Sequence, residues 1–164
     1  MTIRNLVLGV LMCACALTVA AQQKLADLVR DANVEWMIGK WEAADGENVS
    51  LAWSWDLDKN VAVLAGKMGD VEFKGYTAVD PVNGEIKYTG FDSRGSITTG
   101  SWQRSGDEVV LFAEIHSAEP GTTKMAIVFA GSATDGLVVR IHELSGSGDM
   151  VSPARSTTKF KKQK

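Results

Sequence analysis

From Gly39 to the C-terminus, the apolar residues follow a two-residue period that turn residues interrupt at regular intervals. The clearest stretch places an apolar residue at every second position: Val49, Leu51, Trp53, Trp55 and Leu57. This period is typical of antiparallel strands that bury one face and expose the other. The pattern therefore predicts an all-β domain.

Nine clusters rich in Gly, Asn and Asp divide this region into ten segments, because these residues supply positive φ angles or local side-chain hydrogen bonds. The predicted strands span residues 39–44, 48–57, 60–68, 71–79, 85–91, 96–104, 108–117, 122–131, 137–144 and 151–161. Short connections join antiparallel neighbours, which favours an up-and-down meander. Ten such strands can bury their apolar face in a closed barrel or in a two-sheet sandwich. We predict the closed barrel, because closure removes the exposed edges.

A different pattern precedes the strands. Between residues 23 and 37, apolar residues recur at spacings of three, one, three and four: Leu25, Leu28, Val29, Ala32 and Trp36. This spacing predicts a short helix with one apolar face, which Gly39 ends. We expect the helix to cover one end of the sheet as a lid.

The first 21 residues have the features of an export signal. Arg4 supplies a positive start, an apolar run follows over residues 6–19, and small residues precede a cleavage site before Gln22. The run is too short for a membrane-spanning helix, which is the alternative interpretation. Lipidation is a second alternative, but Met12 stands before Cys13 where a lipoprotein signal has a small residue.

We therefore expect a signal peptide at 1–21 and one domain at 22–164, in the periplasm or secreted. Both cysteines leave with the signal, so the domain has no disulfide and no thiolate ligand. Loss of Arg4 changes the net charge from −3 to −4, which does not favour nucleic acid binding. We expect no stable membrane insertion once the signal peptide is cleaved. The lysines at the C-terminal end are interpreted as a solvated, frayed terminus.

The residues that could carry catalysis or bind a metal are few. His116 lies two residues from Glu114 and His142 is next to Glu143, but two ligands do not make a zinc site. No serine lies in the strand-to-helix elbow of a hydrolase, and no glycine-rich phosphate loop is present. We expect no catalytic residues, no metal site and no cofactor.

The aromatic residues are the candidates for ligand binding. Five of them fall on the apolar phase of their strands: Trp53, Trp55, Phe73, Tyr88 and Trp102. Small residues nearby, such as Gly75 and Gly90, leave room inside a barrel or allow its strands to bend. Arg140 is a candidate for binding a ligand carboxylate if it points inward, and for a salt bridge if it points outward.

The helix that leads into Gly39-Lys40-Trp41, followed by a meander of strands, resembles the calycin superfamily, in which lipocalins begin with Gly-x-Trp. The phrases Tyr76-Thr77-Ala78-Val79-Asp80 and Gly90-Phe91-Asp92-Ser93-Arg94-Gly95 are similar to those of secreted bacterial lipocalin-like domains of unknown function. The resemblance covers about residues 34–163 and implies a barrel with a ligand cavity, closed at its base by Trp41. Haem-binding nitrobindins are also ten-stranded relatives, and His142 falls near the position of their haem ligand. Their glycine-rich motif is replaced here by Gly-Lys-Trp-Glu-Ala-Ala.

These observations predict a periplasmic or secreted binding module that holds a small, largely apolar ligand in the barrel. One alternative is an envelope interaction or structural protein without a small-molecule ligand. The other is a haem-binding protein or cofactor-dependent enzyme that uses His116 or His142.

Overall fold

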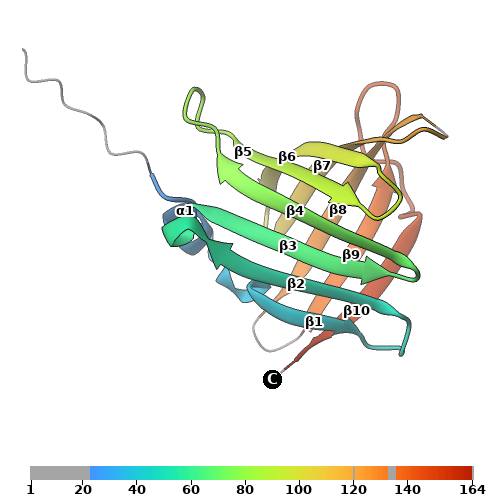
Figure 1. The fold of residues 1–164 in the computed structure, drawn as a ribbon, viewed down its shortest axis with the longest axis horizontal. Helices are drawn as coiled ribbons and strands as arrows, with labels where there is room; N and C mark the ends of the chain where they lie inside the picture. Colours follow the sequence, from blue (N-terminus) through green and yellow to red (C-terminus); the bar gives the residue numbers. More distant parts are fainter. Residues whose placement is uncertain (1–22, 120, 133–135, 164) are drawn as a thin grey trace, which may run out of the picture.

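The computed structural model describes residues 23–119, 121–132 and 136–163, so the expected signal peptide lies outside the described residues. Within these residues, ten antiparallel strands follow one another in an up-and-down order and close into a barrel (Figure 1). The strands are β1 (Gly39–Ala43), β2 (Val49–Asp56), β3 (Val61–Met68), β4 (Val71–Val79), β5 (Ile86–Asp92), β6 (Ile97–Ser105), β7 (Glu108–His116), β8 (Thr122–Ser132), β9 (Gly136–Glu143) and β10 (Ser156–Lys162).

Closure takes place between the first and last strands. β1 pairs antiparallel with β10, with Trp41 opposite Lys162. This pairing confirms the predicted barrel and excludes the sandwich. The interpretation of the C-terminal lysines as a frayed end was wrong, because Lys159, Lys161 and Lys162 belong to the strand that closes the barrel.

Nine strands begin and end within one residue of their predicted positions, and the tenth does not. β10 begins at Ser156 instead of residue 151. Pro153 has no N–H for the ladder. Residues 151–155 keep only isolated backbone–backbone bonds to β9, from Val151 N to Glu143 O and from Arg155 N to Ile141 O. The extra residues therefore form an irregular loop beside β9.

The N-terminal helical region consists of two pieces instead of one. Helix α1 (Leu25–Asp31) is followed by the 3₁₀ turn η1 (Glu35–Met37). Asn33 ends α1 with a φ of 56°, while Asn33 N bonds Arg30 O and Val34 N bonds Val29 O. This is the Schellman pattern of helix termination. Gly39 therefore does not end the helix, as the sequence had suggested, but begins β1.

The core occupies the inside of the barrel, where alternate residues of each strand meet. Its buried members include Trp41, Leu51, Trp53, Leu64, Tyr88, Leu111, Phe129, Leu137 and Phe160. Trp41 is 1% exposed and its Nε1 donates to Met37 O over 2.9 Å, which joins the base of the barrel to η1. A smaller buried cluster, Val110, Ala126 and Val128, occupies the opposite phase of β7 and β8.

Neighbouring aromatic rings occupy the space beside the glycines of the inner wall. A Cβ added at Gly75 or Gly90 would overlap the Tyr88 ring, and one at Gly66 would overlap the Phe73 ring. The glycines therefore seat aromatic side chains against the backbone and leave little empty space of their own.

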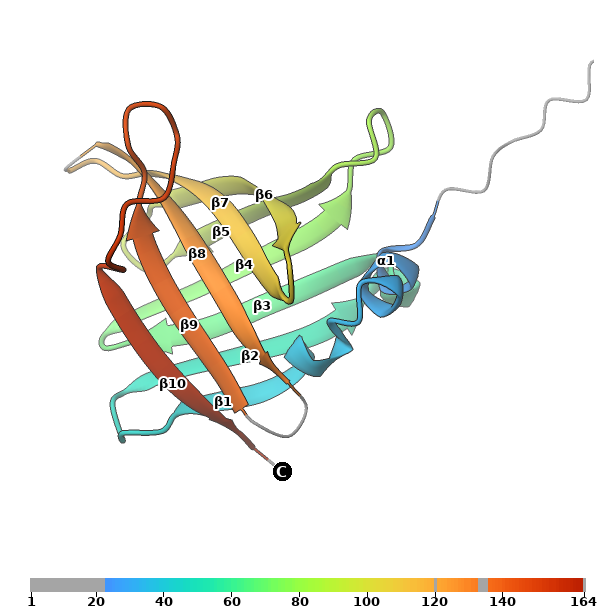
Figure 2. The same cartoon turned by 180° about the vertical axis from the view of Figure 1, so that it is seen from behind.

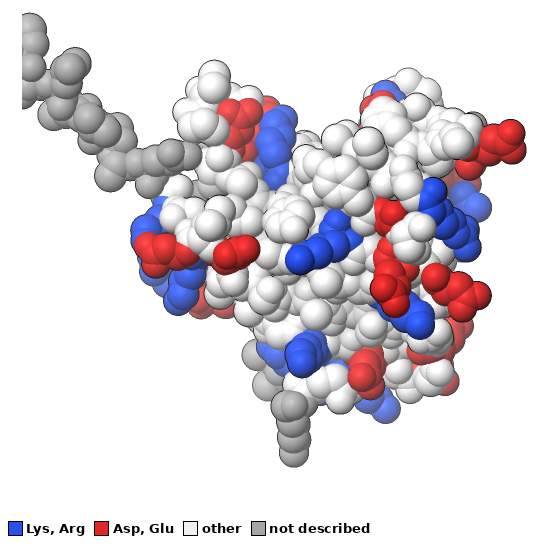
Figure 3. All heavy atoms as spheres, viewed as in Figure 1, with Lys and Arg blue, Asp and Glu red and all other residues white. Residues whose placement is uncertain are grey.

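The outside of the barrel carries interspersed charges. On the face that Figure 3 shows, basic and acidic side chains alternate and form no extended field of one sign. Among the described residues, no helix is long and apolar enough to cross a membrane.

Candidate functional site

A cavity of about 130 Å³ lies between α1 and the barrel. Figure 2 shows α1 beside this end of the barrel, with the long β9–β10 connection at the opposite end. From the helical region, the cavity is lined by Leu25, Leu28, Val29, Ala32, Val34, Met37 and Ile38. The strands contribute Trp53, Ala62, Ile86, Trp102 and Val109, with Thr77, Gln103 and Arg104 as the polar remainder. The lining is therefore almost wholly apolar.

The residues that line the cavity from the helix lie on one face of it, because their spacing matches the helical period. Four of the five residues of the predicted apolar face line the cavity, namely Leu25, Leu28, Val29 and Ala32, whereas Trp36 is not among the lining residues. Leu25 anchors the helix, because its side chain is only 1% exposed. At the helix start, Lys24 Nζ lies 2.5 Å from Asp58 Oδ2 in the β2–β3 connection. The hydrogen bond and the charge of Lys24 lower the pKa of the Asp58 carboxyl, and those of Asp58 raise the pKa of Lys24.

Aromatic rings separate the cavity from the rest of the barrel interior. The Trp102 ring centroid lies 5.5 Å from that of Trp53 and 5.5 Å from that of Phe129, and the Tyr88 ring stands edge-on to Trp102 at 6.3 Å. These spacings are typical of packed aromatic pairs. Trp102 Nε1 donates to Thr77 Oγ1 over 3.1 Å, which fixes the indole in place. The middle of the barrel is therefore filled.

The indole of Trp53 carries a buried donor without an acceptor among the described residues. Trp53 Nε1 has no hydrogen-bond partner, although the residue is only 5% exposed. Phe129 meets the Trp53 ring at 81°, with centroids 5.9 Å apart. Leaving such a donor unpaired costs about 1–3 kcal/mol. The close packing of the aromatic layer is thus obtained at the expense of one hydrogen bond.

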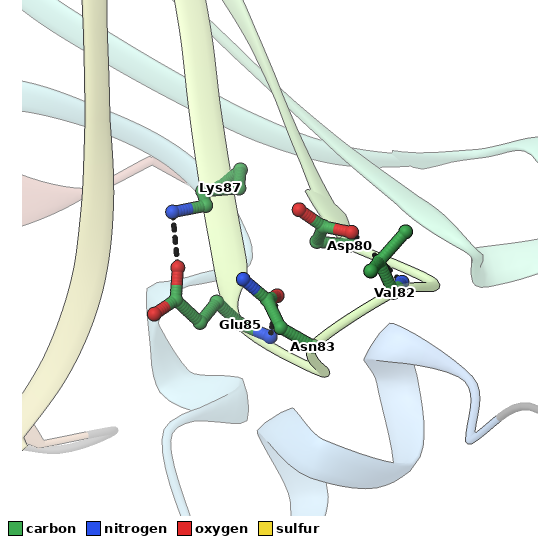
Figure 4. A network of polar contacts seen from close by, with 5 residues as sticks. All are labelled: Asp80, Val82, Asn83, Glu85 and Lys87. Carbon is green, nitrogen blue, oxygen red and sulfur yellow. Dashed lines mark hydrogen bonds and ion pairs between the residues drawn. The ribbon is translucent and has the colours of Figure 1, made fainter.

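The cavity meets solvent beside Gln103 and Arg104 at the end of β6, because these are the exposed members of its lining. Ile86 begins β5 directly after the β4–β5 connection, which is stabilised by hydrogen bonds between its own residues (Figure 4). Asp80 Oδ1 accepts from Val82 N over 2.9 Å, and Asn83 Oδ1 accepts from Glu85 N over 3.0 Å. These Asx turns give the rim beside Ile86 a defined geometry.

The structure brings together two of the predicted wall residues. Trp53 and Trp102 line the cavity, whereas Tyr88 packs behind Trp102. Phe73 lies against Gly66, and Trp55 is half-buried opposite Ala62. Neither Phe73 nor Trp55 is among the lining residues.

Arg140 lies on the outer wall of β9. Its Nη2 donates to Glu108 Oε1 over 2.6 Å, across the intervening strand β8. Val128 pairs with Arg140 and belongs to the outer cluster, which fixes the outward phase. The outward salt bridge is thus the arrangement present, and Arg140 does not reach the cavity.

Both histidines are also on the outer wall. His116 Nε2 lies 3.6 Å from Glu114 Oε1, and Lys124 Nζ lies 3.3 Å from Glu114 Oε2. His142 pairs with Ala126 of the outer cluster, and its Nδ1 lies 2.9 Å from Val151 O. A haem inside the barrel would therefore not reach His142. Within the part of the chain that the structure describes, no three His, Cys, Asp or Glu side chains gather as a metal site.

Sequence reasoning missed the strand residues near the mouth. Ile86, Arg104 and Val109 line the cavity from strand ends, where the two-residue period is too short to be informative. The position of Arg104 two residues after Trp102 could have indicated that it faces inward, because residues two apart on a strand share a face.

Comparison with known proteins adds no closer assignment: no protein-family model matches the chain, and no curated protein matches it. The architecture and the site define the class as a closed ten-stranded antiparallel barrel with an apolar cavity beneath an N-terminal helix.

Proposed function

We propose that this protein is a binding module for a small apolar molecule, about the size of one aromatic ring, held between α1 and the barrel. The observation that carries the proposal is the cavity of about 130 Å³ with its apolar lining. Apolar surface removed from water contributes roughly 25 cal/mol per Å², so an apolar molecule gains free energy by entering this space.

The volume limits the size of the ligand. An apolar cavity of about 150 Å³ is large enough for benzene or xenon, whereas sites for drug-sized molecules occupy about 300–1,000 Å³. The cavity of about 130 Å³ is therefore close in size to one that holds benzene or xenon. A single ring or a short branched chain fits, and a macrocycle such as haem does not.

The proposal includes a calycin-like relationship and a periplasmic or secreted location. The barrel with Trp41 buried at its base supports the first, together with Gly39-Lys40-Trp41 at the start of β1. The features of residues 1–21 support the second.

The test uses benzene as the probe and nuclear magnetic resonance as the readout. Benzene is expected to shift the methyl signals of Leu28, Val29 and Val109, which line the cavity. Ala62→Leu fills the cavity and should abolish the shifts. Ala65→Leu adds the same atoms to the outer phase of the same strand, opposite Lys74, and should leave the shifts unchanged. Shifts that survive Ala62→Leu, or that never occur in the native protein, would contradict the proposal.

A second candidate function, contact with another envelope protein, is favoured by an exposed apolar cluster on the outer wall. Tyr76, Phe91 and Ile97 are 42%, 53% and 43% exposed on the adjacent strands β4, β5 and β6. Phe91 lies opposite Ile97 in the register. Cross-linking in the native host should recover one protein partner that Phe91→Ser loses and Val82→Ser keeps, because Val82 is exposed away from this cluster. Equal recovery by both variants would exclude the surface.

A further inference from the structure

Arg104 is the charged residue in the lining of the cavity, and its position suggests what the ligand carries. It occupies the inward phase of β6, two residues after Trp102, and pairs with Val109 of β7. Its side chain is 51% exposed, so Arg104 contacts both the cavity and solvent. Arg104 therefore places a charged side chain at the boundary between the cavity and solvent.

We infer that the ligand is a small monocarboxylic acid, with its ring in the cavity and its carboxylate bound by Arg104. This inference rests on the proposed function, because it needs the cavity to hold the apolar part. It adds the chemical class of the ligand and its orientation. The carboxylate lies outward, where solvent lowers the cost of its charge.

The existing contacts of Arg104 leave most of its donors for a ligand. A guanidinium has five N–H donors in a planar fork. Nε donates to Gly106 O over 2.8 Å, which orients the plane. Nη2 lies 4.0 Å from Asp107 Oδ1, beyond hydrogen-bond distance, and the Asp107 side chain is fully exposed. A carboxylate can therefore bind the remaining edge of the fork with two parallel hydrogen bonds.

The charge of the lining favours an anion over a cation. Of the residues that form the described cavity, Arg104 is basic and none is acidic. Thr77 Oγ1 already accepts from Trp102 Nε1, and the unpaired Nε1 of the lining residue Trp53 is a donor, so these two residues offer little to a cation. One arginine matches one carboxylate, with the apolar part of the ligand directed inward.

The experiment compares phenyl carboxylates that have zero, one or two methylenes between ring and acid, each with its amide and with benzene. Affinities are measured by calorimetry for the native protein, for Arg104→Gln and for Arg155→Gln. Arg155 is the matched control, because it is also exposed and forms one ion pair, with Glu143 at 3.3 Å, at the other end of the barrel. The acid of optimal length should bind the native protein about tenfold more tightly than its amide, and this preference should vanish in Arg104→Gln alone.

The outcomes separate the two proposals. Benzene binding without a preference for any acid over its amide would overturn the assignment of Arg104 and leave the proposed function in place. Failure of benzene and of every phenyl compound to bind the native protein would overturn both. The comparison of acid with amide needs only native protein, so the inference stays testable even if Arg104→Gln does not fold.

Discussion

At the scale of single residues, Gly75 shows how the barrel interior is filled. A Cβ at this position would overlap the Tyr88 ring, and its φ lies outside the positive range, so the cost of an alanine comes from this clash and not from backbone strain. Gly75→Ala should lower the free energy of unfolding by about 1–3 kcal/mol, the usual cost of overpacking. Urea denaturation measures it. Gly146→Ala is the control, because nothing lies within 4 Å of the added Cβ, and it should change stability by less than about 0.5 kcal/mol.

The same residue marks a limit of sequence analysis. The pattern correctly placed Gly75, Gly90 and Tyr88 on the inner wall, because strand phase is readable from period two. It could not show that the Tyr88 ring lies over both glycines, since that depends on the register of β4 against β5. For Trp53 and Trp102 the wall position and the cavity coincide, whereas for Phe73 another glycine takes up the ring.

Burial of Tyr88 also predicts a pH dependence of stability. Desolvation raises the pKa of its phenol to about 12, above the ordinary 10.0, because ionisation would place a charge in an apolar site. A raised pKa in the folded state contributes stability that is complete below pH 10 and is lost between pH 10 and about 12. The free energy of unfolding should fall there by about 1.4 kcal/mol for each pH unit.

Tyr88→Phe isolates this contribution, since the lysines titrate in both proteins. Urea denaturation of native protein and variant across pH 9–12 provides the measurement. The native curve should fall more steeply than that of Tyr88→Phe, and parallel curves would show that the phenol ionises equally in the folded and unfolded states.

At the scale of elements, the end of α1 depends on the left-handed conformation of Asn33, whose φ is 56°. Asn33→Ala should lower the free energy of unfolding by about 1–2 kcal/mol, because a Cβ without a local polar partner disfavours this conformation. Asn33→Gly should leave stability equal or higher, since glycine adopts positive φ at no steric cost. Denaturation and hydrogen exchange of the Val34 amide, which bonds Val29 O, measure both variants. Equal losses in the two variants would rule out the conformational explanation.

Elements whose boundaries depend on nearby residues were predicted accurately, whereas those that depend on distant pairing were not. Turn residues ended most strands where expected, because Gly, Asn and Asp act within a few positions. The single helix predicted over residues 23–37 was divided by Asn33, a termination signal that is present in the sequence but weaker than a glycine. The late start of β10 depended on Pro153 and on pairing with β9, which the period alone does not contain.

At the scale of the whole molecule, closure of the barrel depends on the seam between β1 and β10, and Lys162 lies at its end. Lys162 Nζ is 5.1 Å from the centroid of the Trp41 ring and donates to Trp36 O over 3.1 Å. It thereby joins the last strand to the first strand and to η1. The neighbouring Lys161 takes the opposite phase and pairs with Glu42.

Lys162→Gln should therefore lower the free energy of unfolding by about 1–2 kcal/mol, because it removes the cation–π contact and the charge-assisted hydrogen bond. Lys161→Gln, with the same change on the outer phase, should stay within about 0.5 kcal/mol. If the seam limits the stability of the whole barrel, Lys162→Gln should shift fluorescence of the buried tryptophans and far-ultraviolet circular dichroism together in one transition. Separate transitions would mean that the seam opens locally, with the remaining strands folded. The opened strands would then expose edges to other molecules.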